Sequence, residues 1–347
     1  MSDIEKEMND TLKEVVQDYQ PKSGFLVDTS DCNNDPPCLY CRSYKEVSKD
    51  KPLTLLEKYG VIDQMIDLGV NQLTLTGGEP FLNPNLADLV KYACNRDMKV
   101  IIATNGKLLT GEFLSGIDKN KVRIQVSLDS IYKEINDTLR GEGSYDAAIR
   151  ALDLCKEYDV KSQTSITITG VNLDSIPDTI EDAISNGSLV KLRQMVVIGR
   201  GESHRELMVD DNELNNLITK YVLNPEYKGR VDIEQVPYFS KNDPKAAKVC
   251  SAGNGIIYVE HDGAVGICPS AKHFVSNVRD KSLKEIYRDM SRFREEGHID
   301  SGFCGRKNVL SLGNGELYSK VAESYTDFSR KPMSAEVFGL FGCKCTG

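Results

Sequence analysis

Short segments rich in β-branched residues alternate with longer amphipathic segments between residues 24 and 198, and this rhythm limits the choice of fold more than any other feature. Strands followed by helices predict parallel strands joined by helical crossovers, the pattern of an α/β protein. Six such units are fewer than the eight of a closed barrel, so we expect a partial (β/α)6 parallel barrel, open on one side. We expect strands at residues 24–29, 72–77, 99–104, 123–128, 163–169 and 192–198, and helices at 55–68, 86–94, 145–158 and 175–185.

Polar and glycine-rich residues follow the ends of the expected strands. The second strand leads into GGEP at residues 77–80, the third into Asn105, and the fourth into Ser127 and Asp129. Parallel barrels place their active sites at the carboxyl ends of the strands. We therefore expect one site at this mouth of the barrel.

Three cysteines lie on the segment that follows the first strand: Cys32, Cys38 and Cys41. A structural zinc ion normally takes four protein ligands, and no fourth cysteine or histidine lies nearby. A cubane iron–sulfur cluster held by three thiolates keeps one iron open to bind another group. The spacing therefore favours a chemically active cluster, and the alternative is a zinc-stabilised loop completed by a distant ligand.

The chain contains ten cysteines and has a net charge of -9 with a pI near 5.2. The acidic charge argues against a nucleic-acid partner. No apolar run is long enough to span a bilayer, and the charged N-terminus lacks the apolar core of a secretion signal. We therefore expect a cytoplasmic, reducing setting, where clustered cysteines suit metal ligation better than disulfides. Cys94 and Cys155 stand in helical patterns and are expected to be buried apolar residues.

A second group of cysteines occupies the last hundred residues. Cys250 and Cys268 flank a segment that predicts a β-hairpin, with Asp262 and Gly263 favouring a type I′ turn. Cys304, Cys343 and Cys345 follow. Four cysteines also suit a structural zinc site, which is the alternative for this region.

With these motifs in place, the chain resembles the radical S-adenosylmethionine (SAM) superfamily over about residues 24–200. The resemblance implies that Cys32, Cys38 and Cys41 hold a SAM-binding [4Fe–4S] cluster. The loop departs from the commonest pattern, because five residues instead of three separate its first two cysteines. The resemblance also implies contacts with SAM from Tyr40, Gly77, Gly78, Glu79, Pro80, Asn105, Ser127, Asp129 and Arg140. Glu79 is expected at the methionine amino group and Arg140 at its carboxylate.

The C-terminal part resembles the cysteine-rich auxiliary extension known as SPASM, or its shorter form, twitch. This resemblance implies one auxiliary [4Fe–4S] cluster on Cys250, Cys268, Cys304 and either Cys343 or Cys345. The expected organisation is an N-terminal helix (1–22), the partial barrel (23–205), a connecting segment (206–245) and a small α+β extension (246–347).

The activity implied by the resemblance is reductive cleavage of SAM to a 5′-deoxyadenosyl radical, which abstracts hydrogen from a substrate. The extension favours a peptide or protein substrate. Few residues precede the first strand, so we expect no separate peptide-recognition domain there, which keeps a small molecule such as a tetrapyrrole precursor as an alternative. A non-catalytic iron–sulfur or zinc scaffold is the alternative from another class. An external one-electron reductant of flavodoxin or ferredoxin type is the implied partner.

Overall fold

The structure is a computed structural model that describes residues 21–42, 51–234, 238–240, 255–269, 274–295 and 310–312. The helix expected over residues 1–22 lies outside these ranges, apart from residues 21 and 22. No helix in the described part of the chain has the length and apolar character that crossing a bilayer requires.

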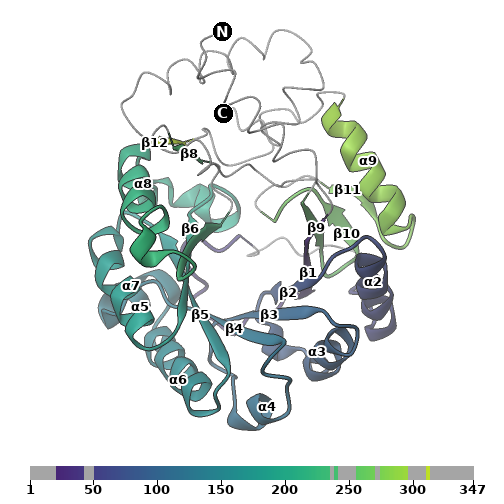
Figure 1. The fold of residues 1–347 in the computed structure, drawn as a ribbon, viewed down its shortest axis with the longest axis horizontal. Coiled ribbons are helices and arrows are strands. Elements are labelled where there is room, and N and C mark those ends of the chain that lie inside the picture. The colour runs from purple at the N-terminus through teal and green to yellow at the C-terminus, as the bar shows by residue number, and fades with distance from the viewer. Residues whose placement is uncertain are drawn as a thin grey trace.

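Six parallel strands form the curved centre of the molecule and follow one another in sequence order, from β1 to β6 (Figure 1). The expected partial barrel is confirmed. The sixth strand starts and ends earlier than predicted, because its ladder runs from Gln163 opposite Leu189 to Ile168 opposite Gln194, and the chain then leaves the sheet. The strands are β1 (Ser23–Thr29), β2 (Gln72–Gly77), β3 (Lys99–Thr104), β4 (Val122–Ser127), β5 (Lys161–Ile168) and β6 (Leu189–Gln194).

The sheet continues beyond the six strands at both edges. A strand that the sequence did not predict, β7 (Val231–Glu234), pairs in parallel with β6. On the other side β9 (Ile256–Val259) pairs in parallel with β1, and β10 (Ala264–Gly266) and β11 (Phe274–Asn277) follow it. The strands β9, β10 and β11, which belong to the expected C-terminal extension, therefore continue the barrel sheet.

The hairpin expected before Cys268 is present, but its turn differs from the prediction. Strands β9 and β10 are antiparallel and are joined by residues 260–263. A type I′ turn needs positive φ at both central residues. In this connection only Gly263 has a positive φ, of 90°. A further two-stranded parallel sheet joins β8 (Tyr238–Ser240) to β12 (Leu310–Leu312).

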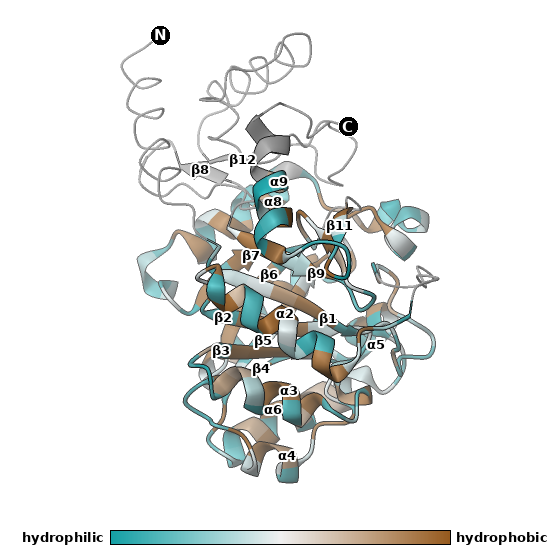
Figure 2. Cartoon of the chain, turned by 90° about the vertical axis from the view of Figure 1, so that its right-hand side faces the viewer, coloured by the Kyte–Doolittle hydropathy of each residue, from teal (hydrophilic) through white to brown (hydrophobic). Residues whose placement is uncertain are grey.

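The helices lie on the outer face of the curved sheet, and Figure 2 shows the hydrophobic colour concentrated in central strands such as β3 and β4. One apolar core packs α2, α3 and α6 against β1 to β4, and a second packs α7 and α8 against β5 to β7. The four helices expected between residues 55 and 185 are confirmed. The helices are α2 (Leu55–Asp67), α3 (Leu86–Cys94), α4 (Gly111–Ser115), α5 (Lys133–Arg140), α6 (Ser144–Glu157), α7 (Ile176–Ser185), α8 (Asp211–Leu217) and α9 (Leu283–Glu295).

Candidate active site

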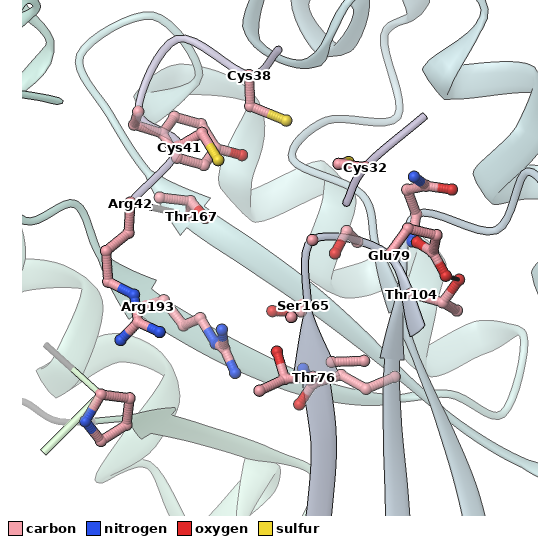
Figure 3. Close-up of a pocket in the computed structure, with 18 of the residues that line it drawn as sticks. Cys32, Cys38, Cys41, Arg42, Thr76, Glu79, Thr104, Ser165, Thr167 and Arg193 are labelled. Carbon is pink, nitrogen blue, oxygen red and sulfur yellow. Dashed lines mark hydrogen bonds between the residues drawn. The ribbon is translucent and has the colours of Figure 1, made fainter. Parts of the chain in front are cut away.

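One pocket opens at the carboxyl ends of the strands and gathers most of the residues that the sequence singled out (Figure 3). Cys32, Cys38 and Cys41 all line it, and Figure 3 shows Cys38 and Cys41 on one wall with Cys32 across from them. The predicted SAM-contacting residues that also line it are Tyr40, Gly77, Gly78, Glu79, Asn105, Ser127 and Arg140. Two others do not line it: Pro80 is buried at the start of a 3₁₀ turn, and Asp129 is buried behind the wall.

The segment that carries the three cysteines, residues 32–41, is called the cysteine loop below. Its residues 37–41 are hydrogen-bonded to two segments that lie far away in the sequence. The Leu39 amide donates to the Leu139 carbonyl at 3.0 Å, at the end of α5. Arg200 donates from its amide to the Cys41 carbonyl at 3.0 Å and from Nη1 to the Pro37 carbonyl at 2.6 Å. The loop geometry therefore depends on elements at both sides of the barrel mouth.

Gly77 and Gly78 bring the end of β2 against the start of the cysteine loop. The Gly78 amide donates to the Thr29 carbonyl at 2.7 Å, and the Glu79 amide donates to the Asp31 carbonyl at 2.7 Å. A Cβ atom on Gly78 would lie 1.9 Å from the Asp31 carbonyl oxygen, a distance that no side chain tolerates. The glycine therefore has a structural reason inside the protein, which is the close approach of two backbones.

Glu79 is almost completely buried, and the protein surrounds its carboxylate with donors. Thr104 donates from its hydroxyl at 2.7 Å, the Asn105 amide donates at 2.7 Å, and the Phe81 amide donates at 3.2 Å. Burial raises the pKa of Glu79 above its ordinary value, although these hydrogen bonds oppose the shift. A carboxylate offers about four lone-pair positions, so Glu79 can still accept from a ligand ammonium group.

Asn105 links the third strand end to the cysteine loop. Its Nδ2 donates to Asn33 Oδ1 at 2.7 Å and to Asn34 Oδ1 at 3.2 Å. Asn34 in turn places its Nδ2 3.3 Å from the sulfur of Cys38. An amide next to a thiolate sulfur is a feature that tunes iron–sulfur sites.

Asp129 is a buried hub beneath the pocket wall. It accepts two hydrogen bonds from Arg140 and one from the Thr167 amide at 2.7 Å, and the hydroxyl of Tyr40 also donates to it. Burial alone lowers the pKa of Arg140, but the charge of Asp129 raises it above the ordinary value. Burial raises the pKa of Tyr40 well above its usual range, against the opposing charge of Arg140. Arg140 thus already has an internal carboxylate partner, and its expected role at the methionine carboxylate stays a prediction.

The sequence reasoning missed the side chains that form the floor of the pocket. These are polar residues within the strands, not after them: Thr74, Thr76, Gln125, Ser165, Thr167, Arg193 and Glu234. Arg42, just after the cysteine loop, lines the pocket as well. A signal for the strand residues exists, because polar side chains alternate with apolar ones in QLTLTG and RIQVSL.

The donor set at the mouth fits a cluster held by thiolates. Three cysteines share one pocket, and soft thiolate ligands select iron–sulfur clusters or zinc. Within the described residues, no three His, Cys, Asp or Glu side chains converge closely enough to hold a single metal ion.

Of the predicted auxiliary ligands only Cys268 lies in the described part of the chain. It follows β10, is buried in the main apolar core, and directly precedes Pro269, which lines the pocket. Cys250, Cys304, Cys343 and Cys345 lie outside the described residues, so the auxiliary ligand set stays a prediction.

Comparison with known proteins relates the chain to a protein family. Residues 26–183 match the Radical SAM superfamily. An AdoMet-dependent heme synthase of Methanosarcina barkeri is 26% identical to the chain, over 85% of this chain and 91% of the relative. The mycofactocin maturase MftC of Mycobacterium tuberculosis is 27% identical, over 77% of this chain and 71% of the relative.

The arrangement of the chain is also similar to solved structures. The crystal structure of Streptococcus suis SuiB bound to S-adenosylmethionine superposes with a TM-score of 0.63 and 18% identity. The match covers 91% of this chain and 75% of SuiB. At this level of identity the likeness speaks for the fold.

Proposed function

Because residues 26–183 form a radical SAM domain, as the sequence predicted, we propose that the chain cleaves S-adenosylmethionine reductively and modifies a peptide or protein. The observation that carries the proposal is the single pocket in which three cysteines face the Gly77–Glu79 segment at the carboxyl ends of parallel strands. An external one-electron reductant of flavodoxin or ferredoxin type completes the system.

The residues of the pocket divide into two groups in this proposal. Cys32, Cys38 and Cys41 hold a [4Fe–4S] cluster, and Glu79 with Asn105 orients SAM beside it. Bound together, cluster and SAM supply a one-electron cleavage that yields methionine and a 5′-deoxyadenosyl radical, the species that abstracts hydrogen from the substrate. Asp129 fixes Tyr40 and Arg140, and through them the wall that carries Cys38 and Cys41.

The peptide substrate is supported by the mycofactocin maturase relative and by the cysteine pattern of the C-terminal extension. A second candidate is a tetrapyrrole precursor, and the heme synthase relative favours it because the match covers nearly the whole of that enzyme. In either case the pocket floor of hydroxyl and amide groups faces the substrate.

The test is anaerobic incubation of the reconstituted protein with SAM, a reductant and cell extract. We expect 5′-deoxyadenosine from the wild type and none from Cys38→Ala. The matched control is Cys155→Ala, a buried core cysteine far from the loop, which should keep the iron and the activity. A wild type that carries iron but releases no 5′-deoxyadenosine would rule out the proposed chemistry. Mass spectrometry of the extract, before and after turnover, separates modified peptides from modified tetrapyrroles.

For the C-terminal extension we propose one auxiliary [4Fe–4S] cluster on Cys250, Cys268, Cys304 and either Cys343 or Cys345, with zinc as the competing occupant. A triple Cys→Ala variant of residues 32, 38 and 41 isolates this site. Residual iron and visible absorbance in that variant support the auxiliary cluster. Stoichiometric zinc without visible absorbance contradicts it, because zinc is d¹⁰.

A further inference from the structure

The interior of this barrel is unusually polar. Closed parallel barrels fill their interior with layers of branched apolar side chains. Here Thr74 and Thr76 on β2, Gln125 on β4, and Ser165 and Thr167 on β5 all line the pocket. The floor therefore offers hydrogen bonds to a polar group that enters from the mouth.

Two arginines stand on the wall away from Glu79, the residue expected at the methionine amino group of SAM. Arg193 belongs to β6, and Arg42 follows the cysteine loop. Figure 3 shows both side chains on the opposite side of the pocket from Glu79 and Thr104. The order of the sheet agrees, since β3, β4 and β5 separate β6 from β2. These two arginines therefore lie across the pocket from the expected site of the methionine amino group.

The arginines of the pocket differ in how far the protein satisfies them. Arg140 is committed to Asp129. Arg42 donates from Nη2 to the Tyr258 hydroxyl at 2.8 Å, and its guanidinium lies 5.2 Å from the centre of that ring. Arg193 contacts Glu234 through Nη2 at 2.7 Å, while its Nε is buried without a hydrogen bond in the described structure.

Arg193 also stays open to the pocket. About a third of its side-chain surface (35%) is exposed, whereas Glu234 beside it on β7 is mostly covered (14%). An arginine that lines the pocket, is held by one carboxylate and keeps part of its side chain exposed is arranged to accept another anionic partner. Its planar fork matches the geometry of a carboxylate.

We propose that Arg193 binds a carboxylate of the substrate, with Arg42 adding positive charge on the same wall. The substrate is then a peptide that presents an acidic side chain or a free C-terminus to the pocket. This inference rests on the proposed function and adds the chemistry of the group that enters the barrel. Glu234 holds Arg193 in place and competes with the substrate for its positive charge.

The experiment measures binding to the reconstituted full-length protein with SAM present. The probes are a blocked Ala-Glu-Ala tripeptide with its Ala-Gln-Ala isostere, and a blocked trialanine as free acid and as amide. Coproporphyrin III and its tetramethyl ester form a third pair. The two members of each peptide pair are nearly isosteric and differ in the negative charge of one carboxyl group, so their difference in affinity reports recognition of the carboxylate. The porphyrin pair differs in charge and in the methyl groups of the ester.

The variants are chosen so that recognition and structural support give opposite results. Arg193→Gln should lower the affinity for the acidic peptide probes by roughly ten- to a hundredfold and leave the affinity for their neutral partners unchanged. Glu234→Gln should raise the affinity for the acidic probes, because it removes the carboxylate that competes for Arg193. The affinity of Arg193→Lys for the acidic probes should lie between those of the wild type and Arg193→Gln, because lysine keeps the positive charge and loses the planar guanidinium. Arg96→Gln, at an exposed ion pair with Asp63 on the outer face, should match the wild type.

Three results would overturn the proposal. The first is a wild type that does not distinguish the acidic peptides from their neutral partners. The second is a loss of binding in Glu234→Gln as large as in Arg193→Gln, which indicates a structural pair. The third is dependence on Arg193 for the porphyrin pair alone, which assigns the wall to a tetrapyrrole. Binding needs no turnover, so these results stay distinct from a failure to release 5′-deoxyadenosine.

Discussion

Arg140 donates from Nε to one oxygen of Asp129 at 2.8 Å and from Nη2 to the other at 3.1 Å, and both side chains are buried. The same carboxylate accepts from the Thr167 amide and from the Tyr40 hydroxyl. One buried ion pair therefore ties α5, β5 and the cysteine loop together. Its role is to set the shape of the pocket wall, whatever the pocket binds.

Breaking this pair should be strongly destabilising. Asp129→Ala leaves the buried Arg140 cation without a partner, and we expect a loss of about 3–5 kcal/mol in the free energy of unfolding. Asp146→Ala removes the exposed pair with Lys133 and should cost at most about 1 kcal/mol. Urea denaturation followed by circular dichroism compares the two. Equal midpoints for both variants would contradict the assignment of Asp129 as a hub.

Gly78 should be essential for the cysteine loop but not for the fold. In Gly78→Ala the new Cβ meets the Asp31 carbonyl oxygen, so the loop must move and iron incorporation should fall several-fold. The matched change is Gly60→Ala within α2, where a Cβ has open space. Alanine there should stabilise the protein by about 0.5–1 kcal/mol through helix propensity. Iron content per chain and thermal melting are the two measurements, and normal iron loading in Gly78→Ala would refute the expectation.

Glu79 should make SAM binding sensitive to acid. Burial raises its pKa above the ordinary 4.5, so its carboxylate takes up a proton at a higher pH than an exposed glutamate. If the charged form binds the ammonium group of SAM, affinity should fall as the pH drops through that raised pKa. Glu79→Gln should weaken SAM binding about tenfold or more at neutral pH and remove the acid-side decline. The exposed Glu112→Gln on α4 should keep both the affinity and the pH profile, as measured by equilibrium binding.

The ion pair between Glu57 on α2 and Arg279 of the expected C-terminal extension should make the free energy of unfolding sensitive to acid. Its hydrogen bonds from Arg279, and then from Thr54 at the start of α2, lower its pKa to about 2 from the ordinary 4.5. A carboxylate with a depressed folded-state pKa stabilises the protein above its unfolded value of 4.5. That stability is lost as the pH falls from 4.5 towards about 2.

The comparison that checks this is the urea midpoint of wild type and Glu57→Gln across acidic pH. The variant should have the lower urea midpoint at neutral pH. The difference between the two midpoints should become smaller as the pH falls from 4.5 towards about 2. Glu112→Gln serves as the reference, since the pair Arg279–Glu57 is intact in it. A gap that does not depend on pH would show that the ion pair adds nothing to stability.

The sequence by itself determined the α/β class, the positions of the six central strands along the chain and the four expected helices of the barrel, because strand and helix periodicity are local properties of the chain. The three-cysteine loop and the motifs that follow the strands, on which the resemblance to the radical SAM superfamily rests, could also be read from the sequence, because each is a short segment of the chain.

Only the tertiary structure decided which of these residues face one another. Gly78 meets Asp31, Arg140 pairs with Asp129, and Arg193 shares the pocket with the cysteines through strand register and the curvature of the sheet. A shift of one residue in register turns every side chain of a strand to the other face. Local periodicity does not specify which strands are neighbours, and for this reason the pairing of β7 with β6 and the meeting of the polar strand residues in one pocket were visible only in the folded chain.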